Sequence, residues 1–223
     1  MFNIAIDGPA GAGKSSIAKE VSGRLGFIYV DTGALYRTVA LNAIRQGIDL
    51  NDANAVIHTL DTADIQLAFE DGSQKVLLNG EDVSSQIRTE EVSAGASKVS
   101  AIPKVREFLF DLQKNIAAKN DCLMDGRDIG TVVLPHADLK IFLTASPEER
   151  AQRRYKQNLE RGMEADYNQI LKEVNERDYQ DTHRDIAPLK QADDAVLLDT
   201  TDMTFDEVVD HLLKLVEEKR NHG

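Results

Sequence analysis

The chain has 223 residues, of which 42% are hydrophobic and 29% charged, a balance typical of a soluble globular domain. Its formal net charge of −12 disfavours nucleic acid as a partner, because an acidic chain repels polynucleotides. No apolar run approaches the ~18 residues of a membrane span, and no signal peptide is recognisable. The single cysteine cannot form an internal disulfide. We therefore expect a cytoplasmic protein without a membrane partner.

The first part of the chain alternates between strand and helix patterns. Residues 3–6 and 27–30 are predicted as strands, because they are short apolar runs rich in β-forming residues. Residues 14–25 and 32–46 are predicted as helices, the first ended by Gly26. This order of strand, helix, strand and helix favours a parallel α/β architecture.

The pattern then changes to alternating apolar and polar residues, which predicts an antiparallel meander over residues 64–84. Asp71-Gly72 and Asn79-Gly80 are its expected turns. Helices are predicted over residues 89–100 and 103–119. We interpret the meander as an insert in the α/β chain.

The strand and helix rhythm returns in the second half. Residues 123–124, 139–143 and 195–198 are predicted as buried strands, and helices are expected from Pro147 onward and over residues 205–219. The fold class is therefore α/β: one domain with a five-stranded parallel sheet, helices on both of its faces, and a small antiparallel β insert.

A glycine-rich segment between the first strand and the first helix matches the phosphate-binding pattern G-x-x-x-x-G-K-[ST] at every fixed position. Glycines allow the backbone to turn its amides inward, and the following helix adds the positive end of its dipole. The residues predicted to bind a nucleoside triphosphate, which is ATP if the chain is a kinase, are Gly8, Pro9, Ala10, Gly11, Ala12, Gly13, Lys14, Ser15 and Ser16. Lys14 would reach the terminal phosphates, and the hydroxyl of Ser15 would bind Mg²⁺.

This pattern occurs in small-molecule kinases, switch GTPases and motor ATPases. The guanine-reading sequence Asn-Lys-x-Asp is absent, and no further ATPase signature is present, which favours a kinase. A kinase also needs positive charge for its acceptor. Arg37 and the Arg127-Asp128 pair each follow a predicted strand, where α/β proteins bind ligands. Two further sets have helical spacing: Arg150, Arg153, Arg154 and Arg161, and Arg177, Asp181 and Arg184.

Four segments together resemble the bacterial cytidylate kinases: IDGPAGAGKSS, VDTGALYR, DGRDIGTVVLPHADLKIFLTAS and ERDYQDTHRDIAPL. The resemblance covers essentially the whole chain. It implies a P-loop kinase that transfers a phosphoryl group from ATP to CMP or dCMP. It also implies Mg²⁺ as the cofactor bound with ATP, a nucleoside-monophosphate-binding insert at residues 60–102, and a helical lid at residues 148–165.

The resemblance further implies roles for individual residues. Those expected to bind CMP are Thr32, Tyr36, Arg37, Ser97, Arg106, Arg127, Asp128, Arg177, Asp181 and Arg184. Those expected to act in catalysis are Lys14, Arg127, Arg150 and Arg154. A monomer is expected, because no surface helix carries an unused apolar stripe. Two alternatives stay open: a kinase for another nucleoside monophosphate or a small alcohol, and a nucleotide-dependent switch protein.

Overall fold

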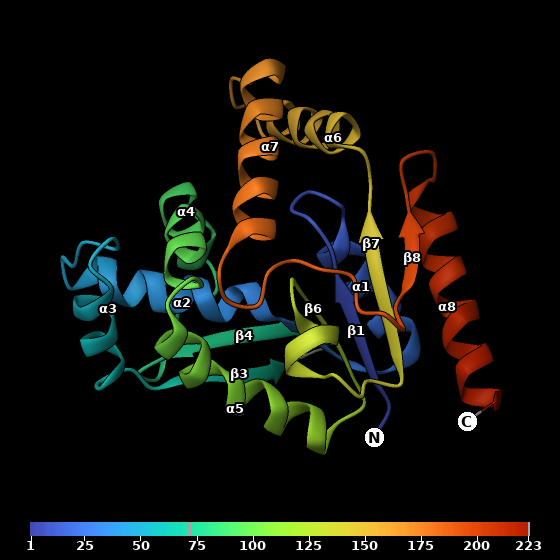
Figure 1. Cartoon of the computed structure of the whole chain (residues 1–223), viewed down its shortest axis with the longest axis horizontal. Helices are drawn as coiled ribbons and strands as arrows, with labels where there is room; N and C mark the ends of the chain where they lie inside the picture. The colour runs from blue at the N-terminus through green and yellow to red at the C-terminus, as the bar shows by residue number, and fades with distance from the viewer. Residues whose placement is uncertain (71–72, 223) are drawn as a thin grey trace. The chain divides into compact units, whose positions relative to one another are not determined.

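The computed structural model describes residues 1–70 and 73–222, and Figure 1 labels its helices and strands. Its chain forms two compact units. Unit 1 comprises Met1 and Phe27–Cys122, and unit 2 comprises Phe2–Gly26 and Leu123–Gly223. Among the described residues, every helix is too short or too polar to cross a membrane.

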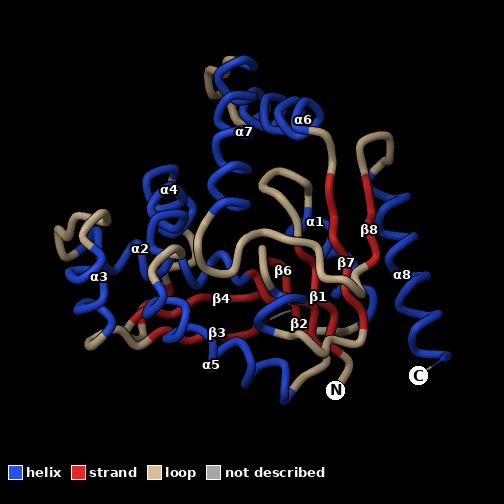
Figure 2. The backbone as a smooth tube through the Cα atoms, in the orientation of Figure 1, coloured by secondary structure: helices blue, strands red, loops and turns tan. Residues whose placement is uncertain are grey.

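The larger sheet has five strands, in the order β2-β6-β1-β7-β8. Their bounds are β1 Asn3–Asp7, β2 Ile28–Asp31, β6 Cys122–Gly126, β7 Leu139–Thr144 and β8 Val196–Asp199. Strands β1 and β7 pair in parallel, as do β7 and β8. The predicted five-stranded parallel sheet is therefore confirmed, and Figure 2 traces its strands in red.

Strand β8 differs from its prediction as a buried strand. It lies at the edge of the sheet, and the side chain of Leu197 keeps 56% of its surface exposed. An apolar run of four residues does not distinguish a central strand from an edge strand, because both need β-forming residues. Only Leu198 of this strand is buried.

The described part of unit 2 carries four helices and a π turn besides its strands. They are α1 Lys14–Leu25, η2 Ile129–Val133 (the π turn), α6 Pro147–Glu160, α7 Tyr167–His183 and α8 Phe205–His222. Helix α1 ends at Gly26 in the left-handed conformation, as predicted, and α6 begins at Pro147. Helices α6 and α7 pack together through a small cluster around Ala151, Ile170 and Val174.

Unit 1 holds the predicted antiparallel insert. The second sheet has the order β3-β4-β5, with β3 Ile65–Glu70, β4 Ser73–Leu78 and β5 Glu81–Asp82. Asn79 and Gly80 both have positive φ, as their turn requires, whereas the predicted turn at Asp71 and Gly72 lies outside the described residues. The remaining elements are α2 Thr32–Arg45, α3 Ala53–Leu60, η1 Gln86–Arg88, α4 Glu90–Val99 and α5 Pro103–Lys119. Helix α3 is not among the predicted elements.

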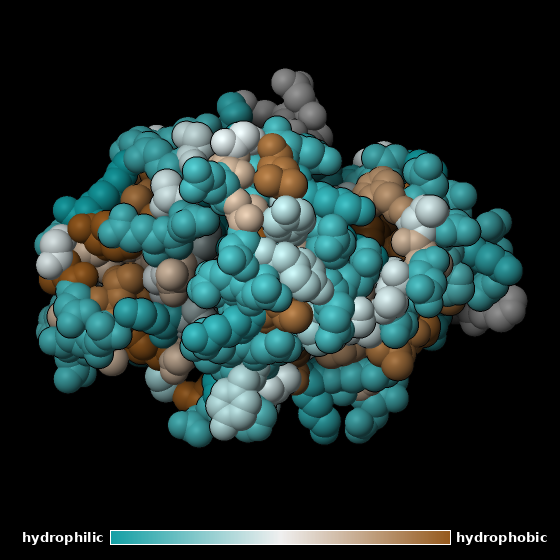
Figure 3. Space-filling view, turned by 90° about the horizontal axis from the view of Figure 1, so that it is seen from above, coloured by the Kyte–Doolittle hydropathy of each residue, from teal (hydrophilic) through white to brown (hydrophobic). Residues whose placement is uncertain are grey.

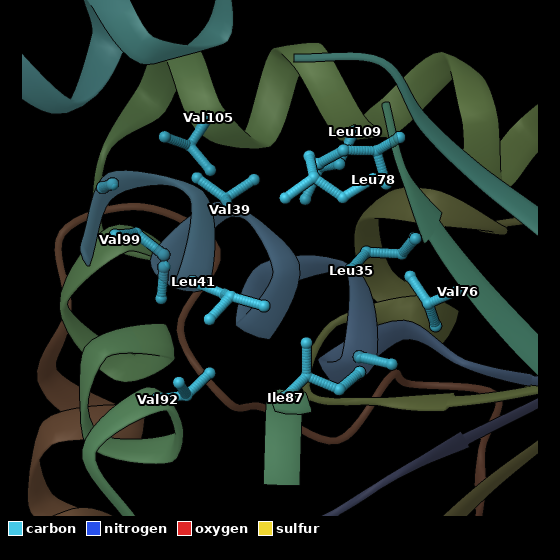
Figure 4. Packing of buried hydrophobic residues seen from close by; sticks show 14 of the residues in the cluster. Leu35, Val39, Leu41, Val76, Leu78, Ile87, Val92, Val99, Val105 and Leu109 are labelled. Atoms are coloured by element: carbon cyan, nitrogen blue, oxygen red, sulfur yellow. The ribbon is translucent and has the colours of Figure 1, made fainter. Parts of the chain in front are cut away.

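The core of unit 1 surrounds helix α2. Side chains from α2, β4, α4 and α5 point toward one another in Figure 4, with Leu35, Val39 and Leu109 completely buried. Burying side chains of this size contributes ~1.5–3 kcal/mol each, so this cluster holds α2 in place. The face of the molecule that Figure 3 shows is mostly hydrophilic, and its hydrophobic residues form separate small patches.

Candidate active site

The glycine-rich loop follows β1 and leads into α1 of unit 2, as predicted. Gly8, Gly11 and Gly13 all have positive φ, a conformation that disfavours other residues. Gly8 has a second reason to be glycine, because a Cβ atom there would lie 1.9 Å from the carbonyl oxygen of Leu143. The loop therefore needs glycine to form beside β7, and the first amides of helix α1 have no acceptor within the helix.

Lys14 is almost completely buried, and its ammonium points back at the loop. Its Nζ donates hydrogen bonds of 2.7 Å to the carbonyl oxygens of Gly8 and Pro9. Burial lowers the pKa of Lys14 well below its usual range, and repulsion from Arg127 acts in the same direction. A positive charge held here is poorly solvated, so an anion brought next to it gains strong stabilisation.

Ser15 contacts a carboxylate that the sequence patterns did not assign to the site. Its Oγ donates a hydrogen bond of 2.8 Å to Oδ2 of Asp125, at the end of β6. Asp125 could have been found by its position, since carboxyl ends of parallel strands gather ligand-binding groups. Mg²⁺ prefers one or two such oxygen donors together with phosphate and water, so the pair fits this ion. The described residues contain no larger cluster of His, Cys, Asp or Glu side chains suited to a metal.

Two arginines and two aspartates of unit 2 form crossed ion pairs. Arg127 donates from Nε to Asp181 at 2.7 Å, and Arg184 lies 3.4 Å from Asp128. Burial tends to raise the pKa of Asp181, but Arg127, Arg177 and Arg184 outweigh it and lower the pKa. Arg184 follows the last helical residue of α7, so the predicted helical spacing ends before it.

The arginines of helix α6 have different surroundings. Arg150 is 2% exposed and donates two hydrogen bonds to the carboxylate of Asp178. It also donates to the carbonyl oxygen of Ala10 in the glycine-rich loop, at 2.9 Å. Arg153 instead binds Glu149 and Thr200, and Arg154 is half-buried. Asp178, like Asp125, is a functional candidate that the sequence patterns missed.

In unit 1, Asp31 fixes the start of helix α2 and one predicted site residue. Its carboxylate accepts from the amide of Ala34 at 3.0 Å and from Nη2 of Arg37 at 2.6 Å. Gly33 lies under this ion pair, because a Cβ atom there would lie 3.1 Å from the guanidinium of Arg37. The DTGALYR segment therefore orients the side chain of Arg37 through contacts within the segment itself.

Four further predicted residues of unit 1 lie on helices α2, α4 and α5. The guanidinium carbon of Arg106 lies 5.7 Å from the centre of the Tyr36 ring, so these two residues make a cation–π contact. Thr32 is buried in the first turn of α2, and Ser97 is half-buried on α4. The structure thus brings Tyr36 and Arg106 together.

Comparisons with known proteins place the chain in one family. The model of the cytidylate kinase family matches residues 4–218. The chain belongs to the cytidylate kinase family. The cytidylate kinase of Lactobacillus johnsonii is 47% identical over 222 residues, covering 100% of this chain and 96% of that protein. The cytidylate kinase of Carboxydothermus hydrogenoformans is 49% identical over 220 residues, covering 99% of both chains.

Solved structures resemble this cytidylate kinase family member in fold alone. A gluconokinase from Sinorhizobium meliloti has a TM-score of 0.50 at 14% identity and covers 99% of this chain and 94% of its own. An uncharacterized protein from Eubacterium ventriosum has a TM-score of 0.53 at 11% identity, covering 97% of this chain and 98% of its own. The predicted resemblance and fold class are both confirmed.

Proposed function

We propose that the protein transfers the γ-phosphoryl group of ATP to CMP or dCMP, giving ADP and CDP or dCDP. Membership of the cytidylate kinase family over residues 4–218 carries this proposal. It favours a kinase with a nucleotide acceptor over a switch protein or a sugar kinase. The glycine-rich loop with a buried lysine is the chemistry that such a transfer requires.

ATP is proposed to bind on the glycine-rich loop of unit 2. The turned backbone and the start of α1 offer amides to its phosphates, and Lys14 offers the positive charge. Arg150 supports the same loop, because it donates to the carbonyl oxygen of Ala10. Its guanidinium is in turn fixed by Asp178. Arg154, on the same helix, is the proposed second arginine of the lid.

Mg²⁺ is the proposed cofactor bound with ATP. The hydroxyl of Ser15 and the carboxylate of Asp125, 2.8 Å apart, are the residues that would hold it. When bound, the ion neutralises part of the charge on the phosphates. The protein groups around it supply the remaining positive charge, chiefly Lys14.

CMP is proposed to bind through predicted site residues of unit 1 and predicted site residues of unit 2. In unit 1, Arg37 would bind its 5′-phosphate, while Tyr36 and Arg106 would lie beside the base. In unit 2, Arg127 would contact the phosphate and Asp181 the sugar hydroxyls. Charge-assisted hydrogen bonds of this type are about twice as strong as neutral ones and fix the orientation of the acceptor. The remaining proposed contacts are those of Thr32, Ser97, Asp128, Arg177 and Arg184.

The reaction proposed is a direct transfer without a covalent enzyme intermediate. A phosphate oxygen of CMP forms a bond to the γ-phosphorus as the bond from that phosphorus to the bridging oxygen breaks, and the electron pair stays on ADP. Lys14 and the arginines stabilise the charge spread over the transferred group. Exclusion of water by closure of a lid protects ATP from hydrolysis.

Further predictions from the sequence stay proposals. They are the insert at residues 60–102 as the monophosphate-binding region, the lid at residues 148–165, a monomeric state, a cytoplasmic location, and no binding of nucleic acid. The packing of α6 against α7 through Ala151, Ile170 and Val174 supports a lid in which the two helices move together.

A panel of acceptors tests the proposed function. ADP release is followed with ATP, Mg²⁺ and either CMP, dCMP, UMP, AMP or no acceptor, each at the same concentration. We expect fast turnover with CMP or dCMP and almost none without an acceptor. Faster turnover of UMP or AMP would point to another monophosphate kinase. ATP consumption that needs no acceptor would instead favour a switch protein.

A further inference from the structure

Asp7 ends strand β1 directly before the glycine-rich loop, and none of the proposed contacts above uses it. Its side chain is 5% exposed, so its two carboxylate oxygens need partners inside the protein. It has them: Oδ1 accepts from the amide of Ile129 and Oδ2 from the amide of Gly130, both at 2.7 Å. A carboxylate that holds two consecutive amides this closely fixes the backbone that carries them.

These two amides open the π turn Ile129–Val133. The first amides of a helical turn have no acceptor within it, and π turns are rare and frequent at functional sites. Later amides of the turn bind backbone oxygens instead: those of Val132 and Val133 donate to Asp128, and that of Leu134 donates to Ile129. Asp7 therefore completes a turn that is 122 residues away in the sequence.

The turn also packs tightly on Asp7. A Cβ atom at Gly130 would lie 3.3 Å from Oδ2 of Asp7 and 3.2 Å from Cδ of Lys140. Arg127 and Asp128 directly precede this turn, and they pair with Asp181 and Arg184. A displacement of the turn would consequently displace both ion pairs.

We propose that Asp7 is a positioning residue for the reaction: it holds the turn after β6 so that Arg127 and Asp128 keep the orientation required to bind the acceptor. This rests on the proposed roles of those two residues toward CMP. Burial favours the neutral acid and raises the pKa of Asp7 to about 6, while the two amides and Lys14 act against this. Asp7 is thus ionised at neutral pH and accepts both hydrogen bonds.

Asp7→Asn tests the proposal with little change in size. The amide oxygen of asparagine accepts from one backbone amide, but its NH₂ group faces the other, donor against donor. We expect KM for CMP to rise about tenfold, a change that corresponds to ~1.4 kcal/mol. KM for ATP should stay within about twofold, because the glycine-rich loop keeps its own contacts.

Asp138→Asn is the matched control. Oδ2 of Asp138 accepts from the amide of Asn3 at 2.7 Å, at the opposite end of the same strand. This variant removes a carboxylate from a backbone amide without touching the turn, so both KM values should remain those of the unaltered protein. An equal rise of both KM values in Asp7→Asn would overturn the positioning role, as would KM values equal to the control.

Hydrogen exchange of single amides tests the contact without any activity assay. The amides of Ile129 and Gly130 should exchange about tenfold faster or more in Asp7→Asn than in Asp138→Asn, because the turn opens more often. Unchanged exchange would overturn the proposal. If the unaltered protein failed to phosphorylate CMP, the proposed function would fall, while this measurement would still decide whether Asp7 holds the turn.

Gly130→Ala is the second variant if Asp7→Asn does not fold. It keeps the carboxylate but adds a methyl group against Asp7 and Lys140. We expect a smaller increase in KM for CMP, again without one for ATP. Kinetics identical to those of the unaltered protein would contradict the proposal.

Discussion

Arg37 of unit 1 and two site arginines of unit 2 are held in different ways. In unit 2, Arg127 and Arg150 are paired with Asp181 and Asp178, which lie 54 and 28 residues away in the sequence. In unit 1, Arg37 is paired with a carboxylate only six residues away, and that carboxylate also caps the same helix. These two arginines of unit 2 are therefore placed by contacts between distant segments, whereas Arg37 of unit 1 is placed by a local turn.

The difference also concerns what supports each arginine. Arg150 is 2% exposed and depends on its partner, because a buried charge without a counter-charge costs several kcal/mol. Arg37 instead depends on helix α2, whose Leu35 and Val39 anchor it in the core of unit 1 (Figure 4). Removal of the partner carboxylate in unit 2 should therefore lower stability mainly through the lost ion pair. Removal of the partner carboxylate in unit 1 should act mainly by displacing helix α2.

The largest effect is expected for Lys14→Met. Loss of one preorganised donor costs ~3 kcal/mol of transition-state stabilisation, so turnover should fall ~100-fold or more. The free energy of unfolding should not fall, because the substitution removes a buried ammonium group whose pKa is lowered by desolvation. Saturating kinetics and thermal unfolding check both statements. Near-normal turnover would show that the phosphates bind elsewhere.

The second largest effect is expected for Arg37 in unit 1. Arg37→Ala should raise KM for CMP by about 10- to 100-fold, since a charge-assisted hydrogen bond contributes ~1.5–3 kcal/mol. Arg45→Ala is the control on the same helix, because Arg45 pairs with Glu81 at the surface. Equal KM values for the two variants would show that Arg37 supports only the fold.

In unit 2, loss of a partner carboxylate should lower the free energy of unfolding. Asp178→Asn leaves the buried guanidinium of Arg150 without its counter-charge, so the free energy of unfolding should fall by about 2 kcal/mol. Glu20→Gln, which breaks the exposed pair between Glu20 and Arg24, is the control and should cost well under ~1 kcal/mol. Urea unfolding measures both. A smaller loss for Asp178→Asn than for Glu20→Gln would break the contrast drawn above.

The sequence predicted most of the fold because its signals are local. The bounds of α1 and α5 follow from Gly26 and Pro103, and the turn at Asn79 and Gly80 follows from residues that tolerate positive φ. Helix α3 was missed, although Asp52 caps it and its hydrophobic face reaches the core. An eight-residue segment gives too short a pattern for its period to be read with certainty.

The candidate site was less accessible than the fold. The glycine-rich loop is continuous in sequence, so its motif gives the residues directly. Asp7, Asp125 and Asp178 each contact a residue at least 28 positions away, and no local pattern carries such pairs. The roles assigned to Arg106 and Ser97 came from family resemblance, since their spacing alone resembles that of any polar helix residue.

The smallest effect is a pH dependence that distinguishes two aspartates of unit 2. Arginines hold the pKa of Asp181 below its ordinary value of 3.8 despite burial, so its ionised form stabilises the folded state. That stability is present above pH ~4 and is lost as the pH falls through the folded-state pKa. The difference in unfolding free energy between the unaltered protein and Asp181→Asn should therefore shrink below pH ~4.

Asp7 should behave in the opposite way, because burial raises its pKa to about 6. The folded state then binds a proton more tightly than the unfolded chain, so its contribution is full below the ordinary pKa of 3.8 and declines as the pH rises through about 6. Urea unfolding of Asp181→Asn, Asp7→Asn and the unaltered protein is measured between pH 3 and 7. For each variant, the difference in unfolding free energy from the unaltered protein is plotted against pH, which gives two slopes. Slopes of the same sign would mean that one of these carboxylates does not have the charge environment described for it.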